Sequence, residues 1–274
     1  CRSKLALMRL ACCCLAFLAS LSAQSTRELN ELNWMEFREL VPAKSDTVLL
    51  PVGTIEAHGV TPNGTDNLAP VAIARKMAPS VNALVAPVVS YGITGSLDAF
   101  AGGITISDNA FRAYLTDVLT GLAKNGFRNI IVLNGHGGNT AVLNEVAEHV
   151  GREQRVRTLV VNWWSYCSDV TFKIFGEDGG HAGLNETAFI QAIDPKLVLR
   201  ERYNANLATP RAEPGTYSAY PFPSSIILYK PGQGYPRFDQ AKADAYFQGV
   251  VEKITVLVRE TIAKWNQAGI FERR

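Results

Sequence analysis

Hydrophobic residues follow two patterns along this chain. Short runs of β-branched and aliphatic residues, which predict strands, occupy residues 47–52, 83–89, 129–133 and 158–161. Between them, apolar residues recur every three or four positions, which predicts helices over 68–77, 108–124, 140–149, 186–193 and 240–265. Apolar strands separated by helices are typical of a parallel sheet covered on both faces. The pattern therefore predicts an α/β fold, a three-layer α/β/α sandwich with a mostly parallel sheet.

Residues 200–238 are rich in proline, glycine and tyrosine and show little periodicity. Segments of this length without regular structure are uncommon inside a domain and often carry function. We expect a surface excursion that caps a site or meets another subunit.

The start of the chain has the composition of an export signal. Three basic residues precede an apolar stretch over 10–21, which ends in small residues. This order predicts a cleaved signal peptide over 1–23 and one domain over 24–274, in a protein exported to the periplasm or secreted. A buried helix or a membrane anchor is the alternative, but the stretch is short for the ~20 residues of a span. The cysteines at 12–14 would permit a lipid anchor, although they lie early in the stretch.

Removal of this leader changes the charge balance. It holds three of the 27 basic residues and none of the 25 acidic ones, so 24 basic and 25 acidic residues remain. A near-neutral chain without a basic run offers no footprint for nucleic acid or for a membrane surface. No later apolar run is long enough to insert stably in a membrane. Only Cys167 remains of five cysteines, so no internal disulfide is expected.

Polar residues come directly after the predicted strands. Glu56 and His58 follow the first strand, His136 follows the third, and Trp163 and Trp164 follow the fourth. In open parallel sheets, ligands bind beyond the carboxyl ends of the strands. We therefore place the candidate site at this edge of the sheet.

The first polar segment, GTIEAHGVTPNGTD, contains Glu56, His58 and Asp66. Divalent cations are held by carboxylate oxygen and imidazole nitrogen together. Each residue also has an ordinary interpretation: a surface glutamate, a core histidine, and an aspartate that caps a helix. This segment alone is weak evidence for a metal site.

Two further glycine-rich loops carry histidines. His136 lies in LNGHGGNT, and GEDGGHAGLNETA contains Glu177, Asp178, His181 and Glu186. Glycines between a strand and a helix can also bind phosphate, but neither loop fits a nucleotide-binding motif. Three of the four histidines lie in glycine-flanked loops instead of on apolar helix faces, which favours a metal or catalytic site.

Nucleophilic catalysis has little support in the sequence. The chain contains no GxSxG motif, and Cys167 lacks a cysteine-protease signature, so we expect it to be structural. Trp163 and Trp164 suit either the core or stacking on a flat substrate.

In these three segments the sequence resembles the creatininase family. The matching stretches are LPVGTIEAHG with Thr65 and Asp66, NGHGGN over 134–139, and HAGLNET over 181–187. The resemblance implies an α/β/α subunit, often in a hexamer, with two divalent ions (Zn, Mn or Fe) that serve the hydrolysis of small amides. It therefore implies a small-molecule amide as substrate and a homo-oligomer as assembly.

The resemblance also implies a ligand set. Glu56, Asp66 and His136 correspond to the ligands of one metal, and His58 and Asp66 to ligands of the other, with Asp66 bridging. Creatininase has a glutamate ligand where this chain has Gly138, and we expect Glu186 to take its place.

Gly137 replaces an aromatic residue that helps creatininase to hold its cyclic substrate. The resemblance therefore supports the reaction class more strongly than creatinine itself, with Gly137 and Trp164 in the substrate-binding wall.

Hydrolysis of an amide requires a proton for the leaving nitrogen. We expect His181 to deliver it, oriented by Glu177 or Asp178. A deformylase or small peptidase of the same fold is the alternative enzyme. A binding protein that kept the fold without the chemistry is a further hypothesis, and a nucleotide-binding protein is the least favoured.

Overall fold

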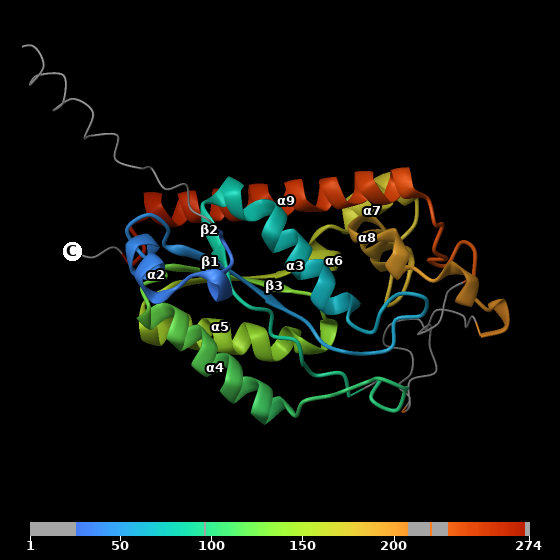
Figure 1. The fold of residues 1–274 in the computed structure, drawn as a ribbon, viewed down its shortest axis with the longest axis horizontal. Helices are drawn as coiled ribbons and strands as arrows, with labels where there is room; N and C mark the ends of the chain where they lie inside the picture. The colour runs from blue at the N-terminus through green and yellow to red at the C-terminus, as the bar shows by residue number, and fades with distance from the viewer. Residues whose placement is uncertain (1–25, 96, 208–219, 221–229, 272–274) are drawn as a thin grey trace, which may run out of the picture.

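The sheet at the centre of the molecule is parallel throughout. The computed structural model describes residues 26–95, 97–207, 220 and 230–271. In this part of the chain, the strands of the sheet are β1 (Thr47–Val52), β2 (Ala83–Val85), β3 (Asn129–Asn134) and β4 (Arg157–Asn162). Their order is β2-β1-β3-β4 (Figure 1). Val52 pairs with Asn134, and Asn134 pairs with Asn162. The carboxyl ends of β1, β3 and β4 therefore lie level at one edge.

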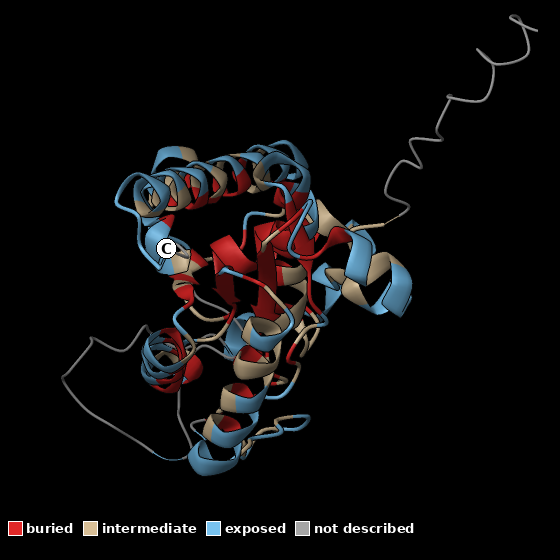
Figure 2. Cartoon of the chain, turned by 90° about the vertical axis from the view of Figure 1, so that its left-hand side faces the viewer, coloured by how far each residue is buried: buried red, intermediate tan, exposed pale blue. Residues whose placement is uncertain are grey.

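Helices cover both faces of this sheet. Those on one face are α4 (Asp108–Lys124) and α5 (Thr140–Gln154), and those on the other are α3 (Thr65–Met77), α8 (Leu184–Ile193) and α9 (Gln240–Gln267). Figure 2 shows a buried sheet and helices whose outer sides are exposed. The described residues thus form the predicted three-layer α/β/α sandwich.

The amphipathic pattern explains how the helices pack. Phe111, Leu115 and Leu119 of α4 are buried and recur every four positions, so they share one face. The Ser107 side chain accepts a hydrogen bond from the amide of Ala110, which satisfies a donor at the start of this helix. Strands β1 and β3 are buried along their whole length, as their apolar composition predicts.

The sequence located most elements and missed the short ones. Helices α2 (Trp34–Leu40), α6 (Trp163–Tyr166) and α7 (Ser168–Phe175) were not predicted, because too few turns were present to establish a period. The same is true of the 3-10 helices Leu29–Glu31, Ala78–Val81, Gly137–Asn139, Pro195–Leu197, Arg200–Arg202 and Ala205–Leu207.

The predicted strand over 83–89 is shorter in the structure, where β2 ends at Val85. Pro87 has no amide hydrogen to contribute to a ladder, and the chain rejoins the sheet only at the isolated bridge between Val52 and Val89. The segment after β2 thus follows β1 to its carboxyl end, where Val89 lies beside Val52.

Several expectations concern residues outside the described ranges. The predicted signal peptide over 1–23 lies outside them, as do residues 208–219 and 221–229 of the expected excursion. Among the helices that the structure describes, none combines the length and apolarity needed to cross a membrane.

Candidate metal centre

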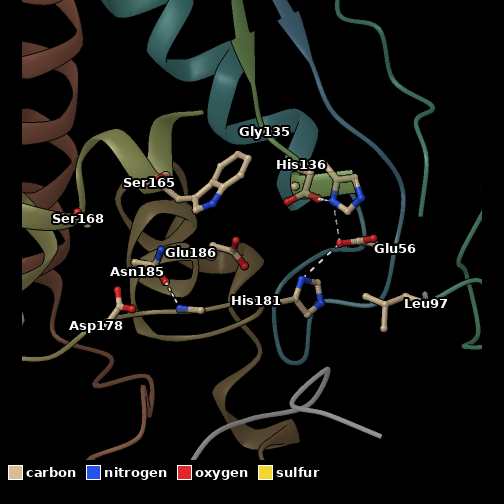
Figure 3. Close-up of a pocket in the computed structure, with 14 residues that line it drawn as sticks. Glu56, Leu97, Gly135, His136, Ser165, Ser168, Asp178, His181, Asn185 and Glu186 are labelled. Carbon is tan, nitrogen blue, oxygen red and sulfur yellow. Dashed lines mark hydrogen bonds and ion pairs between the residues drawn. The ribbon is translucent and has the colours of Figure 1, made fainter. Parts of the chain in front are cut away.

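A cavity of about 470 Å³ opens at the carboxyl ends of β1 and β3 (Figure 3). Its lining combines carboxylates, histidines, glycines and a tryptophan: Glu56, Asp66, Leu97, Gly135, His136, Gly137, Trp164, Ser165, Ser168, Asp178, Gly180, His181, Asn185 and Glu186. All three glycine-rich segments contribute to it. The cavity lies at the edge of the sheet where the strand-end pattern placed the candidate site.

Asp66 lies between two histidines. Its Oδ1 is 3.0 Å from Nε2 of His58, and its Oδ2 is 2.9 Å from Nδ1 of His136. Asp66 is the second residue of α3, and the N-cap position is Gly64, so the capping interpretation of Asp66 is wrong. Each carboxylate oxygen faces a different imidazole, which is the arrangement expected of a bridging ligand.

Two groups of ligand atoms share this aspartate. Glu56, Asp66 and His136 form one group, in which Oε1 of Glu56 lies 3.2 Å from Nδ1 of His136. His58, Asp66 and Glu186 form the other, in which Nε2 of His58 lies 3.4 Å from Oε2 of Glu186. The ligand atoms within each group lie within 4.8 Å of one another. Both groups mix carboxylate and imidazole, which suits zinc, manganese and iron.

Backbone carbonyls orient the three histidines. Nδ1 of His58 lies 3.2 Å from the Glu56 carbonyl oxygen, Nε2 of His136 lies 2.9 Å from that of Ile93, and Nε2 of His181 lies 2.7 Å from that of Ala57. A ring nitrogen that donates to a carbonyl leaves the other nitrogen unprotonated in the neutral ring. Metal-binding histidines are oriented in this way.

Three buried atoms of the site face other potential ligand atoms at 2.9–3.3 Å without making a well-oriented hydrogen bond to a described residue. They are Oε1 of Glu56, Nε2 of His58 and Oδ2 of Asp66. A buried polar atom without a hydrogen-bond partner is costly, and these three atoms belong to residues of the two groups. Divalent cations would satisfy them, so these residues fit a two-cation site.

The charges of the site shift its pKa values in the protein without cations. Burial disfavours a charged His58, but Asp66 and Glu186 together outweigh burial and raise the pKa of His58 well above its usual value. Burial is likewise outweighed at His136, where hydrogen bonds to Asp66 and Glu56 raise the pKa to about 10. Although burial alone would raise it, the pKa of Asp66 is held well below its usual range by His58 and His136. Burial, aided by the charge of His58, lowers the pKa of His181.

Gly138 cannot be replaced by a ligand side chain in this backbone. A Cβ there would lie 2.1 Å from the Ile93 carbonyl oxygen and 2.6 Å from Nε2 of His136. Glu186 instead reaches the neighbourhood of His58 from the first turn of α8, where its Oε2 accepts a hydrogen bond of 2.6 Å from the amide of Ala182. Glu186 thus lies beside His58 and Asp66, and its role as a substitute ligand stays a prediction.

Of the three residues expected to handle protons, two line the cavity and one does not. His181 lines the cavity, and its Nδ1 lies 3.3 Å from Oε1 of Glu56. Glu177 accepts hydrogen bonds from Arg237, at 2.5 Å, and from the amide of Gly234, so its carboxylate holds a neighbouring loop instead of orienting His181. Asp178 lines the cavity with His181 (Figure 3).

His181 also belongs to a third group of potential ligand atoms, with Glu56 and His58. Geometry alone therefore permits it to act as a ligand.

The two adjacent tryptophans have different environments. Trp163 is buried and its ring lies 4.8 Å from that of Phe189, so the core interpretation applies to it. Trp164 lines the cavity beside Gly137, where a Cβ would lie 3.9 Å from the Trp164 ring. Cys167 is fully buried, and burial raises the pKa of its thiol to about 12, which fits a structural residue.

Sequence reasoning missed several residues of the site. The hydroxyl of Thr94 donates a hydrogen bond to Oε2 of Glu56, yet nothing near Thr94 in the sequence marks it as part of a site. Asn139 accepts a hydrogen bond from the amide of Ile93. Its place at the end of NGHGGN could have marked it as part of the site. The cavity residues Leu97, Ser165, Ser168 and Asn185 were also not predicted.

Several known proteins resemble this chain in sequence. The family model described as "Creatininase: Creatinine amidohydrolase" matches residues 30–258. A creatinine amidohydrolase of Pseudomonas putida is 29% identical over 194 residues, covering 64% of this chain and 74% of that protein. A mycofactocin precursor peptide peptidase of Mycobacterium ulcerans is 32% identical over 185 residues, covering 63% of this chain and 68% of that protein.

Solved structures resemble the chain over most of its length. A crystal structure of creatinine amidohydrolase is 25% identical, with a TM-score of 0.75, and the match covers 86% of this chain and 98% of that one. A mutant creatininase of the Zn-Zn type and a manganese creatininase match over the same shares, each with 25% identity and a TM-score of 0.73.

Proposed function

This chain belongs to the creatininase family, and from that premise we propose that it is a metal-dependent amidohydrolase that cleaves the C–N bond of a small amide. Its relatives are hydrolases, and the neighbouring structures include zinc and manganese forms. When bound, two divalent cations would polarise the amide carbonyl and lower the pKa of a water molecule to near 7.

One observation carries the proposal: Asp66 directs one carboxylate oxygen to His58 and the other to His136. A buried aspartate that only stabilised the fold would need one charged partner, whereas Asp66 faces two imidazoles that repel each other when both are charged. As a shared ligand, it would hold two cations beside each other. We assign Glu56 and His136 to one position and His58 and Glu186 to the other.

His181 is the residue that we propose for proton transfer. Burial and the charge of His58 lower its pKa in the protein without cations, and its Nε2 is bound to the Ala57 carbonyl. Nδ1 faces the cavity and Glu56, so Nδ1 is the atom that would take up a proton and pass it to the leaving nitrogen. Nε2 of His181 is thus held by the backbone, and Nδ1 is available for proton transfer.

The substrate wall is formed by Trp164 and Gly137. Because Gly137 has no side chain, the space beside the Trp164 ring is open. The cavity therefore has room beside Trp164 for a substrate larger than a small cyclic amide. This observation favours a second candidate within the same reaction class, which is a formamide or the end of a short peptide. The mycobacterial relative is itself named a peptidase.

Metal content tests the proposal before any substrate is known. We would purify the protein without chelators, incubate it with zinc, manganese or iron, and compare wild type with Glu186→Ala by mass spectrometry. Two equivalents in the wild type and one in the variant are expected. Glu148→Ala, on the exposed surface of α5, is the matched control and should retain two.

Hydrolysis assays on cyclic amides, formamides and short peptides would then identify the class of bond. A wild type that takes up none of the three metals would overturn the proposal in favour of a binding protein.

Two further proposals come from the sequence and from the family. We propose that the chain is exported through the segment 1–23, which would be tested by N-terminal sequencing of protein recovered from the periplasm and the medium. We also propose that the protein is a homo-oligomer. Light scattering would measure the mass of the assembly. A monomer or an uncleaved cytoplasmic product would contradict these proposals.

A further inference from the structure

We infer that Thr94 is a positioning residue that holds Glu56 for one metal position only, the position formed with Asp66 and His136. The inference rests on the proposed metal-dependent function. It concerns a residue that forms no part of the three glycine-rich segments and does not line the cavity.

Thr94 occupies a specific place beside Glu56. It lies in the segment between β2 and α4, its side chain is buried, and its hydroxyl donates to Oε2 of Glu56. Glu56 is itself fully buried. Because one of its oxygens is bound to the hydroxyl, the other, Oε1, is directed to His136 at 3.2 Å.

The residue before Thr94 holds a second ligand of the same position. The Ile93 carbonyl accepts a hydrogen bond from Nε2 of His136 at 2.9 Å. Two consecutive residues therefore orient two of the three ligands. Their own positions are fixed, since the Ile93 amide donates to Asn139 at 2.9 Å and the Thr94 amide donates to the Thr105 hydroxyl at 3.1 Å.

The other metal position is held by different groups. His58 is oriented by the carbonyl of Glu56, and Glu186 by the amide of Ala182. Among the described hydrogen bonds, none joins His58 or Glu186 to Thr94. Loss of the Thr94 hydroxyl should therefore weaken one metal position and spare the other.

Thr94→Val, which removes the hydroxyl and keeps the shape, tests this selectivity. Groups that orient metal ligands typically contribute 10- to 100-fold in affinity. We expect the dissociation constant of one metal equivalent to rise by about that factor, so that one equivalent of two remains after dialysis, while Thr94→Ser restores both. In the Glu186→Ala background, Thr94→Val should remove the remaining equivalent.

Thr187→Val is the matched control, because the Thr187 hydroxyl is also buried but has no partner among the described residues. It should retain two equivalents. If Thr94→Val does not fold, Thr105→Val provides a second test. Thr105 is exposed, and its hydroxyl accepts the hydrogen bond from the Thr94 amide. Its loss should lower the affinity for the same metal equivalent, by less than Thr94→Val does.

Two unchanged equivalents in Thr94→Val, or equal weakening of both, would overturn the inference. A wild type without metal would instead overturn the proposed function, so the two failures are distinguishable.

Discussion

The backbone carbonyl oxygen of Asp66 lies where a side chain at Gly135 would begin. A Cβ at Gly135 would be only 2.0 Å from that oxygen, so the absence of a side chain after β3 lets the first turn of α3 approach the end of the strand. This close approach determines how near the Asp66 carboxylate lies to His58 and His136.

Gly135→Ala should therefore displace Asp66 and reduce metal binding. Overpacking of this kind typically costs about 1–3 kcal/mol, which thermal unfolding would detect. Gly137→Ala is the control, since its Cβ would meet only the Trp164 ring at 3.9 Å, and it should keep both metals and its stability. Full metal content in Gly135→Ala would show that α3 can move without loss of the site.

Asp66→Ala should empty both metal positions, because each of its oxygens faces a different ligand group. Glu56→Ala and Glu186→Ala should each remove about one equivalent. The surface aspartate Asp169, which pairs with Lys253, provides the control. An Asp66→Ala protein that still holds two metals by mass spectrometry would contradict the bridging assignment.

Metal affinity should fall as the pH falls. The pKa of His136 is raised to about 10 and that of His58 is also raised, so both are protonated at pH 7 in the protein without cations. Metal binding requires their neutral forms, so filling both positions should release about two protons near neutral pH.

Calorimetry in buffers of different ionisation enthalpy would count these protons. The affinity should be higher at pH 8 than at pH 6. Binding without proton release, or affinity independent of pH, would argue against histidine ligands.

His181→Ala should lower turnover far more than metal content. Loss of a positioned proton donor typically costs about 100- to 10,000-fold in rate, whereas the two ligand groups that share Asp66 do not require His181. His149→Ala, on the exposed part of α5, should change neither quantity. A parallel loss of metal and activity would identify His181 as a ligand, which its place beside Glu56 and His58 also permits.

Much of the fold could be predicted because its information is local. The helix over 108–124 and the strand over 47–52 have the predicted bounds, since hydrophobic periodicity depends only on which side of each element faces the core. The glycine-rich segments singled out Glu56, His58, Asp66, His136, His181 and Glu186 as candidates, and these residues form the three groups of potential ligands in the structure. For Glu56, His58 and His136 the reason is local, because each follows a strand of a parallel sheet.

What the tertiary structure decided is which of these residues meet. His181 binds the Ala57 carbonyl across 124 positions of the chain, and Thr94 binds Glu56 across 38. Such contacts depend on how the layers pack and on where loops turn, which no local pattern encodes. For the same reason, Glu177 holds Arg237 instead of His181. The sequence by itself determined the chemistry available at the site, and the packing of α3 against β1 and β3 and of α8 against α3 decided how that chemistry is arranged.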